Sequence, residues 1–280
     1  MLSEIYVLYM REIKKWAGRR PVLIISLITP LFWILLFGKS FNIINVLSVE
    51  GLGVPADIAI VVVGALRSRI AQLFGTLDYF TYVASGMIVV FTLFHSVFSG
   101  ASVIFDRRLG YMSRLMASPI RRESIFIAKV LATVFRVIIL ILFLLALSYI
   151  AGFKFKQDLS ILDLVGALIV VISISVTLTS IFMLLGFLTD SHEFLFAIGN
   201  LVNMPLMFSS SALFPIDQMP DWLKAIAKLN PLTYAADLTR YFLVGRHLDE
   251  PYIILIILIA GAILTFTICM KVSVKALERT

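Results

Sequence analysis

Long apolar runs that carry almost no charge are the feature of this sequence that most restricts its fold. Several runs of roughly twenty residues, such as 161–188, are long enough to cross about 30 Å of hydrocarbon. Hydrophobic residues make up 60% of the chain and charged residues 15%, whereas soluble domains have roughly 45–50% and about 25%. A single soluble core cannot hide that much apolar surface, so we expect the lipid bilayer to be the solvent.

We predict an all-α polytopic membrane protein, with residues 1–280 forming a single transmembrane domain. Six spans are expected at 21–38, 80–104, 125–150, 161–188, 194–214 and 251–271. Lys and Arg gather before the first span, after the second and after the last, which places these regions and both termini in the cytoplasm. We expect a plasma-membrane location, no cleaved signal peptide, and a small external elaboration at 39–79.

An amphipathic helix is predicted at the N-terminus, within residues 1–20. Its apolar side chains recur every three or four positions, and Glu4, Arg11, Glu12, Lys14 and Lys15 fall on its other faces. Trp16 and the lysines suit the headgroup region, so we expect an interfacial helix on the membrane surface. A helix that faces only water is the alternative.

Catalytic and metal-binding motifs are absent from the sequence. There is no GxxxxGK[ST] phosphate loop, HExxH, GxSxG or paired Cys. The chain therefore cannot hydrolyse a nucleotide by itself, and we expect no catalytic residue, no metal and no cofactor bound by this chain. The net charge of +7 follows the cytoplasmic Lys and Arg excess and does not indicate nucleic acid. Cys269 is expected only to pack.

Ionisable residues in the middle of the spans are few. An ion-coupled carrier would need acidic or His residues at membrane depth, because burying each one is costly. Here His95 lies near the middle of the second span and Arg136 lies within the third. Lys129 and Arg136 can extend to the cytoplasmic headgroups, which makes Arg136 an anchor. His95 is either a neutral interhelical residue or a proton relay or substrate contact.

Small polar side chains form a second group inside the spans. Ser173, Thr177 and Ser180 share one face of the fourth span, and Asn200 and Asn203 precede Pro205 in the fifth. Such side chains either bond one helix to another or line a polar route through the membrane. Candidate pathway residues are His95, Ser173, Thr177, Asn200 and Asn203.

A short amphipathic helix is predicted in the cytoplasmic connection 105–118. Charged residues open it, Leu109, Met112 and Leu115 follow at helical spacing, and Pro119 ends it. Such a helix is typical of a segment held between the bilayer and a partner protein.

A helical hairpin is predicted on the outer side, over residues 214–245. Pro220 suits a first helical position, Asp221 suits the positive end of a helix, and Asn230-Pro231 separates the two helices. The second helix, 231–244, ends at Gly245, which suits a C-terminal cap. We expect the hairpin to re-enter the outer leaflet and act as an external gate. The candidate gate residues are Pro215, Pro220, Trp222, Asn230, Pro231 and Tyr234.

Several of these segments together resemble the permease subunits of ABC-2 type ABC transporters, particularly the daunorubicin-resistance-like branch. The segments are 78–82 with Gly86, 106–108 with Gly110, 118–122, 214–215, 219–220, and 230–234 with Asp237 and Arg240. The resemblance implies two permease copies or paralogues paired with two separate ATPase subunits, which bind ATP and Mg. It also implies that 105–118 is a coupling helix against the ATPase. The residues concerned are Asp106, Arg107, Arg108, Gly110, Met112, Arg114, Leu115 and Pro119.

One position departs from that family pattern. Many relatives carry Glu three positions after the glycine, where this chain has Ser113, so the corresponding ion pair with an ATPase is in doubt. The resemblance implies export of drugs, lipids or lipid-linked glycans, and a pathway of Leu, Ile, Phe and Val favours an amphiphile. An ion-coupled carrier or channel without an ATPase is the alternative. A membrane enzyme or assembly factor would need a cluster of interfacial ionisable groups, which the sequence lacks.

Overall fold

A computed structural model describes residues 1–18 and 78–278, with scattered positions between them. Only scattered positions of the predicted first span, 21–38, and of the predicted external elaboration, 39–79, are among the described residues. The described helices are α1 (Leu2–Ala17), α5 (Tyr79–Arg108), α6 (Tyr111–Met116), α7 (Arg122–Ile150), α8 (Ile161–Leu188), α9 (His192–Phe208), the 3-10 turn η2 (Ile216–Gln218), α10 (Asp221–Leu229), α11 (Pro231–Val244) and α12 (Pro251–Leu277).

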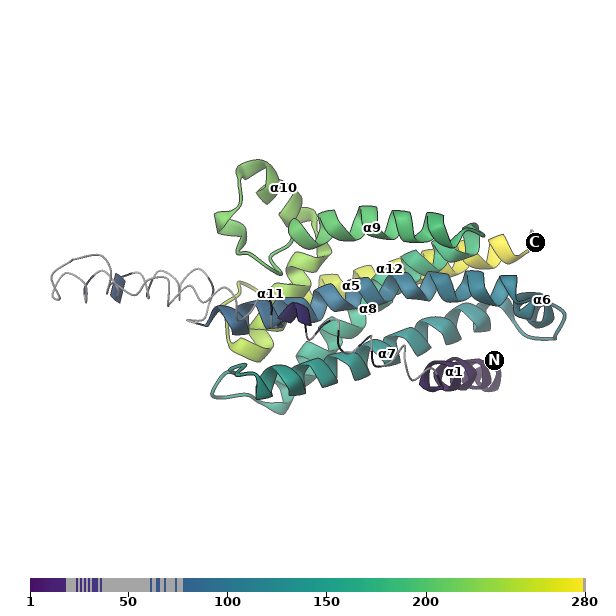
Figure 1. Ribbon diagram of the computed structural model, residues 1–280, viewed down its shortest axis with the longest axis horizontal. Coiled ribbons are helices and arrows are strands. Elements are labelled where there is room, and N and C mark those ends of the chain that lie inside the picture. Colours follow the sequence, from purple (N-terminus) through teal and green to yellow (C-terminus); the bar gives the residue numbers. More distant parts are fainter. Residues whose placement is uncertain are drawn as a thin grey trace.

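Four of these helices, α5, α7, α8 and α12, are long and apolar enough to cross a membrane. They lie side by side along the long axis of the molecule (Figure 1). α5 is the most enclosed, since it packs against α7, α8, α9 and α11. The described part of the chain is therefore an α-helical bundle built around α5, as the apolar runs predict in outline.

α5 and α8 cross at two glycines. A Cβ added at Gly100 would lie 2.3 Å from the Phe182 carbonyl oxygen, and one at Gly186 would lie 2.4 Å from the Gly100 carbonyl oxygen. The two backbones therefore touch, as helix pairs in membranes do where small residues meet. Ser99 adds a hydrogen bond from its hydroxyl to the Thr179 carbonyl oxygen at 3.3 Å.

The fifth predicted span, 194–214, differs from the structure. α9 has 17 residues, ends at Phe208, and is not among the helices of spanning length. The serines that follow bond to the last turn of α9 and to α11. The Ser210 hydroxyl donates to the Met207 carbonyl oxygen, and the Ser211 hydroxyl donates to Thr233 and Asp237 of α11. The other four described spans begin within three residues of their predicted starts, and they end at most six residues beyond their predicted ends.

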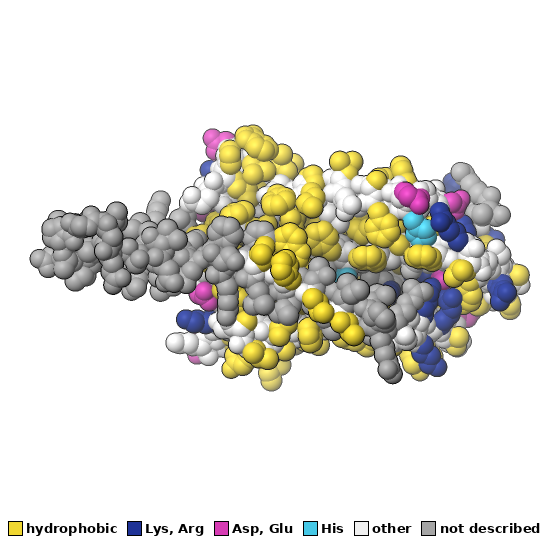
Figure 2. Space-filling view, in the orientation of Figure 1, with side chains coloured by type: hydrophobic (Ala, Val, Ile, Leu, Met, Phe, Trp, Pro, Cys, Tyr) yellow, Lys and Arg dark blue, Asp and Glu magenta, His cyan; other side chains and the backbone are white. Residues whose placement is uncertain are grey.

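Positive charge is concentrated at one end of the bundle. That end carries α1, α6 and both termini, while α10 and α11 lie towards the opposite end (Figure 1). On the face in view, apolar side chains cover the middle of the molecule, and Lys and Arg gather around the end with α1 and α6 (Figure 2). We call the end with α1 and α6 the basic end, and the end with α10 and α11 the hairpin end.

Candidate functional site

The junction of α5 and α6 lies at the basic end. α5 runs through to Arg108, so the first residues of the predicted coupling helix 105–118 belong to the long helix. Gly110 adopts a left-handed conformation, with φ at +68°, which L side chains rarely adopt. The chain then re-enters a helix for six residues, and Pro119 follows shortly after it. The predicted segment is therefore a helix end, a glycine turn and a short separate helix.

The two faces of α6 differ in exposure. Met112 and Leu115 are buried in a cluster with Leu8 of α1 and Phe126 of α7. They hold α6 in place and do not contribute to its outer face. The exposed residues of 109–119, which we call the α6 surface, are Leu109, Ser113, Arg114, Ala117 and Pro119.

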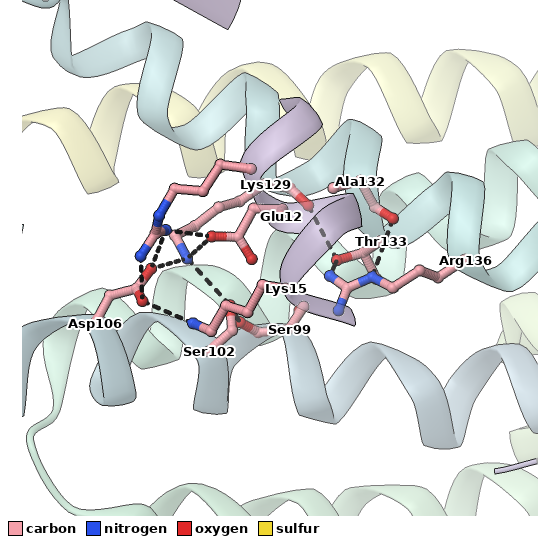
Figure 3. A network of polar contacts seen from close by, with 10 residues as sticks. Glu12, Lys15, Ser99, Ser102, Asp106, Lys129, Ala132, Thr133 and Arg136 are labelled. Atoms are coloured by element: carbon pink, nitrogen blue, oxygen red, sulfur yellow. Dashed lines mark hydrogen bonds and ion pairs between the residues drawn. The ribbon is translucent and has the colours of Figure 1, made fainter. Parts of the chain in front are cut away.

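A buried cluster of charges joins three helices behind α6. Asp106 of α5, Lys129 of α7 and Glu12 of α1 converge there (Figure 3), and each is at most 3% exposed. The ammonium of Lys129 lies 2.5 Å from Asp106 Oδ2 and 3.1 Å from Glu12 Oε1. Asp106 is thus turned inward and cannot contact a partner protein directly. Lys129 does not extend to the headgroups as predicted, because these two carboxylates bind it.

Arg11 and Lys15 of α1 complete this cluster. Lys15 Nζ lies 2.8 Å from Asp106 Oδ1, and Arg11 Nη1 lies 2.9 Å from Glu12 Oε1. The Arg11 guanidinium also lies over the Tyr111 ring, 3.3 Å from its centroid, which connects the cluster to α6. We call Arg11, Glu12, Lys15, Asp106 and Lys129 the charge cluster. Its three cations and two carboxylates leave one net positive charge.

Burial makes this cluster sensitive to the loss of Glu12, Asp106 or Lys129. Removing one partner of a buried ion pair typically costs about 3–5 kcal/mol, because the other charge stays uncompensated away from water. α1, α5 and α7 are therefore held in one arrangement at the basic end, and α6 moves with them.

A further contact fixes the first turn of α1 to the start of α7. The Ser124 hydroxyl and the Arg121 backbone N–H both donate to Glu4 Oε2, at 2.9 and 3.2 Å. The bond from Ser124, followed by that from Arg121, lowers the pKa of Glu4 below its usual value. α1 is thus bound at both ends of its inner face.

Arg107 and Arg108 connect the end of α5 to the turn between α8 and α9. Arg107 donates to the Phe187 carbonyl oxygen at 2.8 Å and pairs with Asp190, and Arg108 donates to the Asp190 carbonyl oxygen at 3.0 Å. Cations near the end of α8 also oppose its negative dipole. Both arginines therefore make bonds within the chain.

A second buried network lies towards the hairpin end, where α11 meets α5. Arg240 is 1% exposed. It donates to the Ala212 carbonyl oxygen at 2.8 Å and to Asp237 at 3.1 Å, and its guanidinium lies over the Tyr82 ring. Gly86 allows this approach, since a Cβ there would lie 2.0 Å from the Ala212 oxygen. α11 is thus bound into the bundle and does not lie on its surface.

The hairpin residues divide between buried and exposed positions. Asn230 and Pro215 are buried, and Asn230 donates to the Leu206 carbonyl oxygen at 2.7 Å. The second helix and its glycine cap have the predicted limits, Pro231–Val244 with Gly245 at φ +81°. Pro220 caps α10 and is not its first helical residue. Trp222 is 67% exposed, and the Tyr234 hydroxyl donates to the Lys228 carbonyl oxygen at 2.6 Å.

The candidate pathway residues do not form one surface. The Ser173 hydroxyl donates to the Ile169 carbonyl oxygen and the Thr177 hydroxyl to the Ser173 carbonyl oxygen, both within α8. Asn200 is exposed on α9, whereas Asn203 is buried and its Oδ1 makes no hydrogen bond within the described residues. His95 is partly exposed and contacts Phe98.

Sequence reasoning missed the charge cluster. Glu12 was predicted on a polar face of α1, yet it is buried between helices. The sequence did offer one signal, because Lys129 lies in the third predicted span and Asp106 lies at the end of the second. Buried charges are generally paired. Within 1–18 and 78–278, no group of three or more His, Cys, Asp or Glu could hold a metal ion.

Comparison with known proteins places this architecture in a family. The profile of the family described as ABC-2 type transporter matches residues 3–244. A protein of Pyropia yezoensis named as transport permease ycf38 is 30% identical over 242 residues, which cover 86% of this chain and 74% of that protein. A daunorubicin resistance ABC transporter permease protein of Streptomyces coeruleorubidus is 26% identical over 170 residues, covering 61% of this chain and 59% of that protein.

A shorter match is to nodulation protein J of Rhizobium leguminosarum bv. trifolii, 32% identical over 85 residues, or 30% of this chain and 32% of that protein. The family match covers most of the chain, including the charge cluster, α6 and the Arg240 network. The chain therefore belongs to the ABC-2 type transporter family, among whose members are drug-resistance ABC permeases.

Proposed function

We propose that this chain is the membrane-spanning permease subunit of an ATP-driven exporter. A separate ATPase would bind at the basic end and supply the energy, with ATP and Mg held by that partner. A second permease copy or paralogue would complete the transporter in the plasma membrane, with both termini in the cytoplasm. The cargo would be an amphiphile, namely a drug, a lipid or a lipid-linked glycan.

The observation that carries this proposal is the way α6 is attached. α6 follows directly from α5 through the Gly110 turn, and its inner face packs on α1 and α7. The charge cluster binds these three helices together. A push on the α6 surface would therefore move the ends of α5 and α7 together, since packed elements shift as units.

ATP binding would close the partner ATPase dimer and displace α6. α5 would transmit the displacement to the hairpin end, because it contacts α11 through Gly86 and the Arg240 network. Residues 214–245 would then act as the outer gate, with the exposed face of α10 in the outer leaflet. The two ends would open alternately as ATP binds and is hydrolysed.

An ion-coupled carrier or channel is the second candidate function. Such a protein moves its cargo without a nucleotide-hydrolysing partner, which allows a direct test. The purified chain is reconstituted in liposomes with and without its copurified ATPase, and export of a panel of fluorescent amphiphiles is measured with ATP. We expect transport only with both the ATPase and ATP. Equal transport without the ATPase would refute the proposal.

Replacing Gly110 with valine tests the coupling role. Valine is strained at φ +68°, at a cost of about 1–2 kcal/mol, although a Cβ there meets no atom within 4 Å. We expect the α5–α6 turn to change direction, so that ATP hydrolysis persists while transport per ATP falls several-fold. The measurement is the ratio of export to phosphate release in liposomes.

Gly152 offers a matched control for this variant. It also has a positive φ, at +109°, with open space around it, but it lies in the turn after α7 at the far end of that helix. Gly152→Val should strain the backbone comparably and leave the coupling ratio unchanged. Equal ratios for the two variants would contradict the role given to α6. Leu115→Asp is unsuitable here, because Leu115 is buried and an aspartate would disrupt packing.

A further inference from the structure

Arg136 lies far from either end of α7. It is about 21 Å along the helix from Arg122, at about 1.5 Å per residue. His95 of α5 lies about 20 Å from Arg108 by the same measure, and α5 and α7 pack against each other. The two residues are therefore at similar depth, near the middle of the bilayer.

Within the described residues, no carboxylate pairs with Arg136 at this depth. The described spans α5, α7, α8 and α12 carry Asp or Glu only near their ends, namely Asp106, Glu123 and Asp163. The predicted first span, 21–38, contains no acidic residue. Glu12, the carboxylate whose charge reaches Arg136, is already bound by Lys129 and Arg11.

The known bonds of Arg136 are to its own helix. Its Nε donates to the Ala132 carbonyl oxygen at 3.1 Å, and its Nη2 donates to the Thr133 hydroxyl at 2.9 Å (Figure 3). Both acceptors are neutral, so the positive charge stays unmatched. Its guanidinium is thus held one to two turns above Lys129, and Lys129, Thr133 and Arg136 form a polar line along α7 that starts at the charge cluster.

An unmatched cation at mid-membrane is costly. Placing an arginine at the centre of a spanning helix is unfavourable even on insertion scales, and a neutral side chain would avoid that cost. A matching anion recovers part of it, because opposite charges interact strongly where water is scarce. Arg136 is partly exposed at this depth, so it can contact such an anion.

We infer that Arg136, with Thr133 on the same helix and His95 at a similar depth on α5, binds the anionic headgroup of the transported amphiphile. The site would select a phosphate or carboxylate group attached to an apolar tail, and reject a cationic headgroup. This inference rests on the proposed function only where it identifies the ligand as the transported cargo. Binding of the anionic amphiphile needs neither an ATPase nor nucleotide.

The test measures binding to the purified full chain in phosphatidylcholine nanodiscs without ATPase. Two fluorescent probes share one dodecyl tail and carry either a phosphate or a trimethylammonium headgroup, and inorganic phosphate serves as a tail-free competitor. We expect the phosphate probe to bind about tenfold more tightly than the cationic probe, and Arg136→Gln to remove that tenfold preference. Arg136→Lys should keep most of it, and inorganic phosphate should not compete.

Lys154→Gln is the matched control, because Lys154 is exposed outside the spans and its loss changes the net charge equally. It should bind both probes as the unaltered chain does. Equal affinity of the unaltered chain for the two probes, or an unchanged preference in Arg136→Gln, would overturn the inference. Competition by inorganic phosphate would show a general anion site and also overturn it. Failure of the ATPase-dependent transport assay would instead refute the proposed function.

Discussion

Asp106→Asn is expected to destabilise the protein and abolish ATP-driven transport. The carboxylate is fully buried and accepts bonds from Lys129 and Lys15 at 2.5 and 2.8 Å. Asparagine keeps the shape but leaves the charge cluster with two net positive charges. We expect a loss of about 3–5 kcal/mol, the usual cost of breaking a buried ion pair. The measurements are thermal inactivation of the purified protein and export in liposomes.

Two further variants make this test specific. Asp190→Asn removes a carboxylate that is 78% exposed and pairs with Arg107. Because surface ion pairs contribute about 0–1 kcal/mol, it should change stability little. Asp106→Asn combined with Lys129→Met restores the net charge of the cluster and should be more stable than Asp106→Asn alone. Equal stability of Asp106→Asn and the unaltered protein would contradict the structural role of the cluster.

Gly86→Ala is expected to damage the opposite end of the bundle. The new Cβ would lie 2.0 Å from the Ala212 carbonyl oxygen and 2.6 Å from Nη2 of Arg240. Because a backbone atom cannot move at low cost, α5 must separate from the chain at Ala212, and Arg240 must lose its bonds there. We expect a loss of about 3 kcal/mol or more, the upper end of the overpacking range. Thermal inactivation and the fraction of monodisperse protein measure it.

Gly261 of α12 provides the matched control, since a Cβ there meets no atom within 4 Å. Gly261→Ala should be neutral or stabilising by up to about 1 kcal/mol, because alanine is the better helix former. If both substitutions had equal effects, the close approach of α5 to the Ala212 carbonyl would not be the reason for glycine at position 86.

The local features of the fold could be read from the sequence. The limits 161–188 and 231–244 were predicted as the structure has them, because apolar length, proline at a helix start and glycine at a helix end act over a few residues. The helix limits at 105–118 were wrong, since α5 continues through Arg108 and only Tyr111–Met116 forms a separate helix. Periodicity could not show that Gly110 breaks the segment.

The positions of charged side chains could not be read in the same way. Arg107 and Arg108 were assigned to a partner, yet both bond to the turn between α8 and α9. Leu115 was expected to face a partner, yet it packs inward with Phe126. A helical pattern identifies an apolar face but does not say which protein surface or lipid covers it.

The sequence by itself determined that this chain is a helical membrane protein and where most of its described spans lie. Those properties follow from residue composition and short-range spacing. Only the tertiary structure decided which charges are buried. Glu12 and Lys129 are 117 residues apart and meet because α1 packs on α7. The free energy of a charge depends on its neighbours in space, and those are set only when the helices pack.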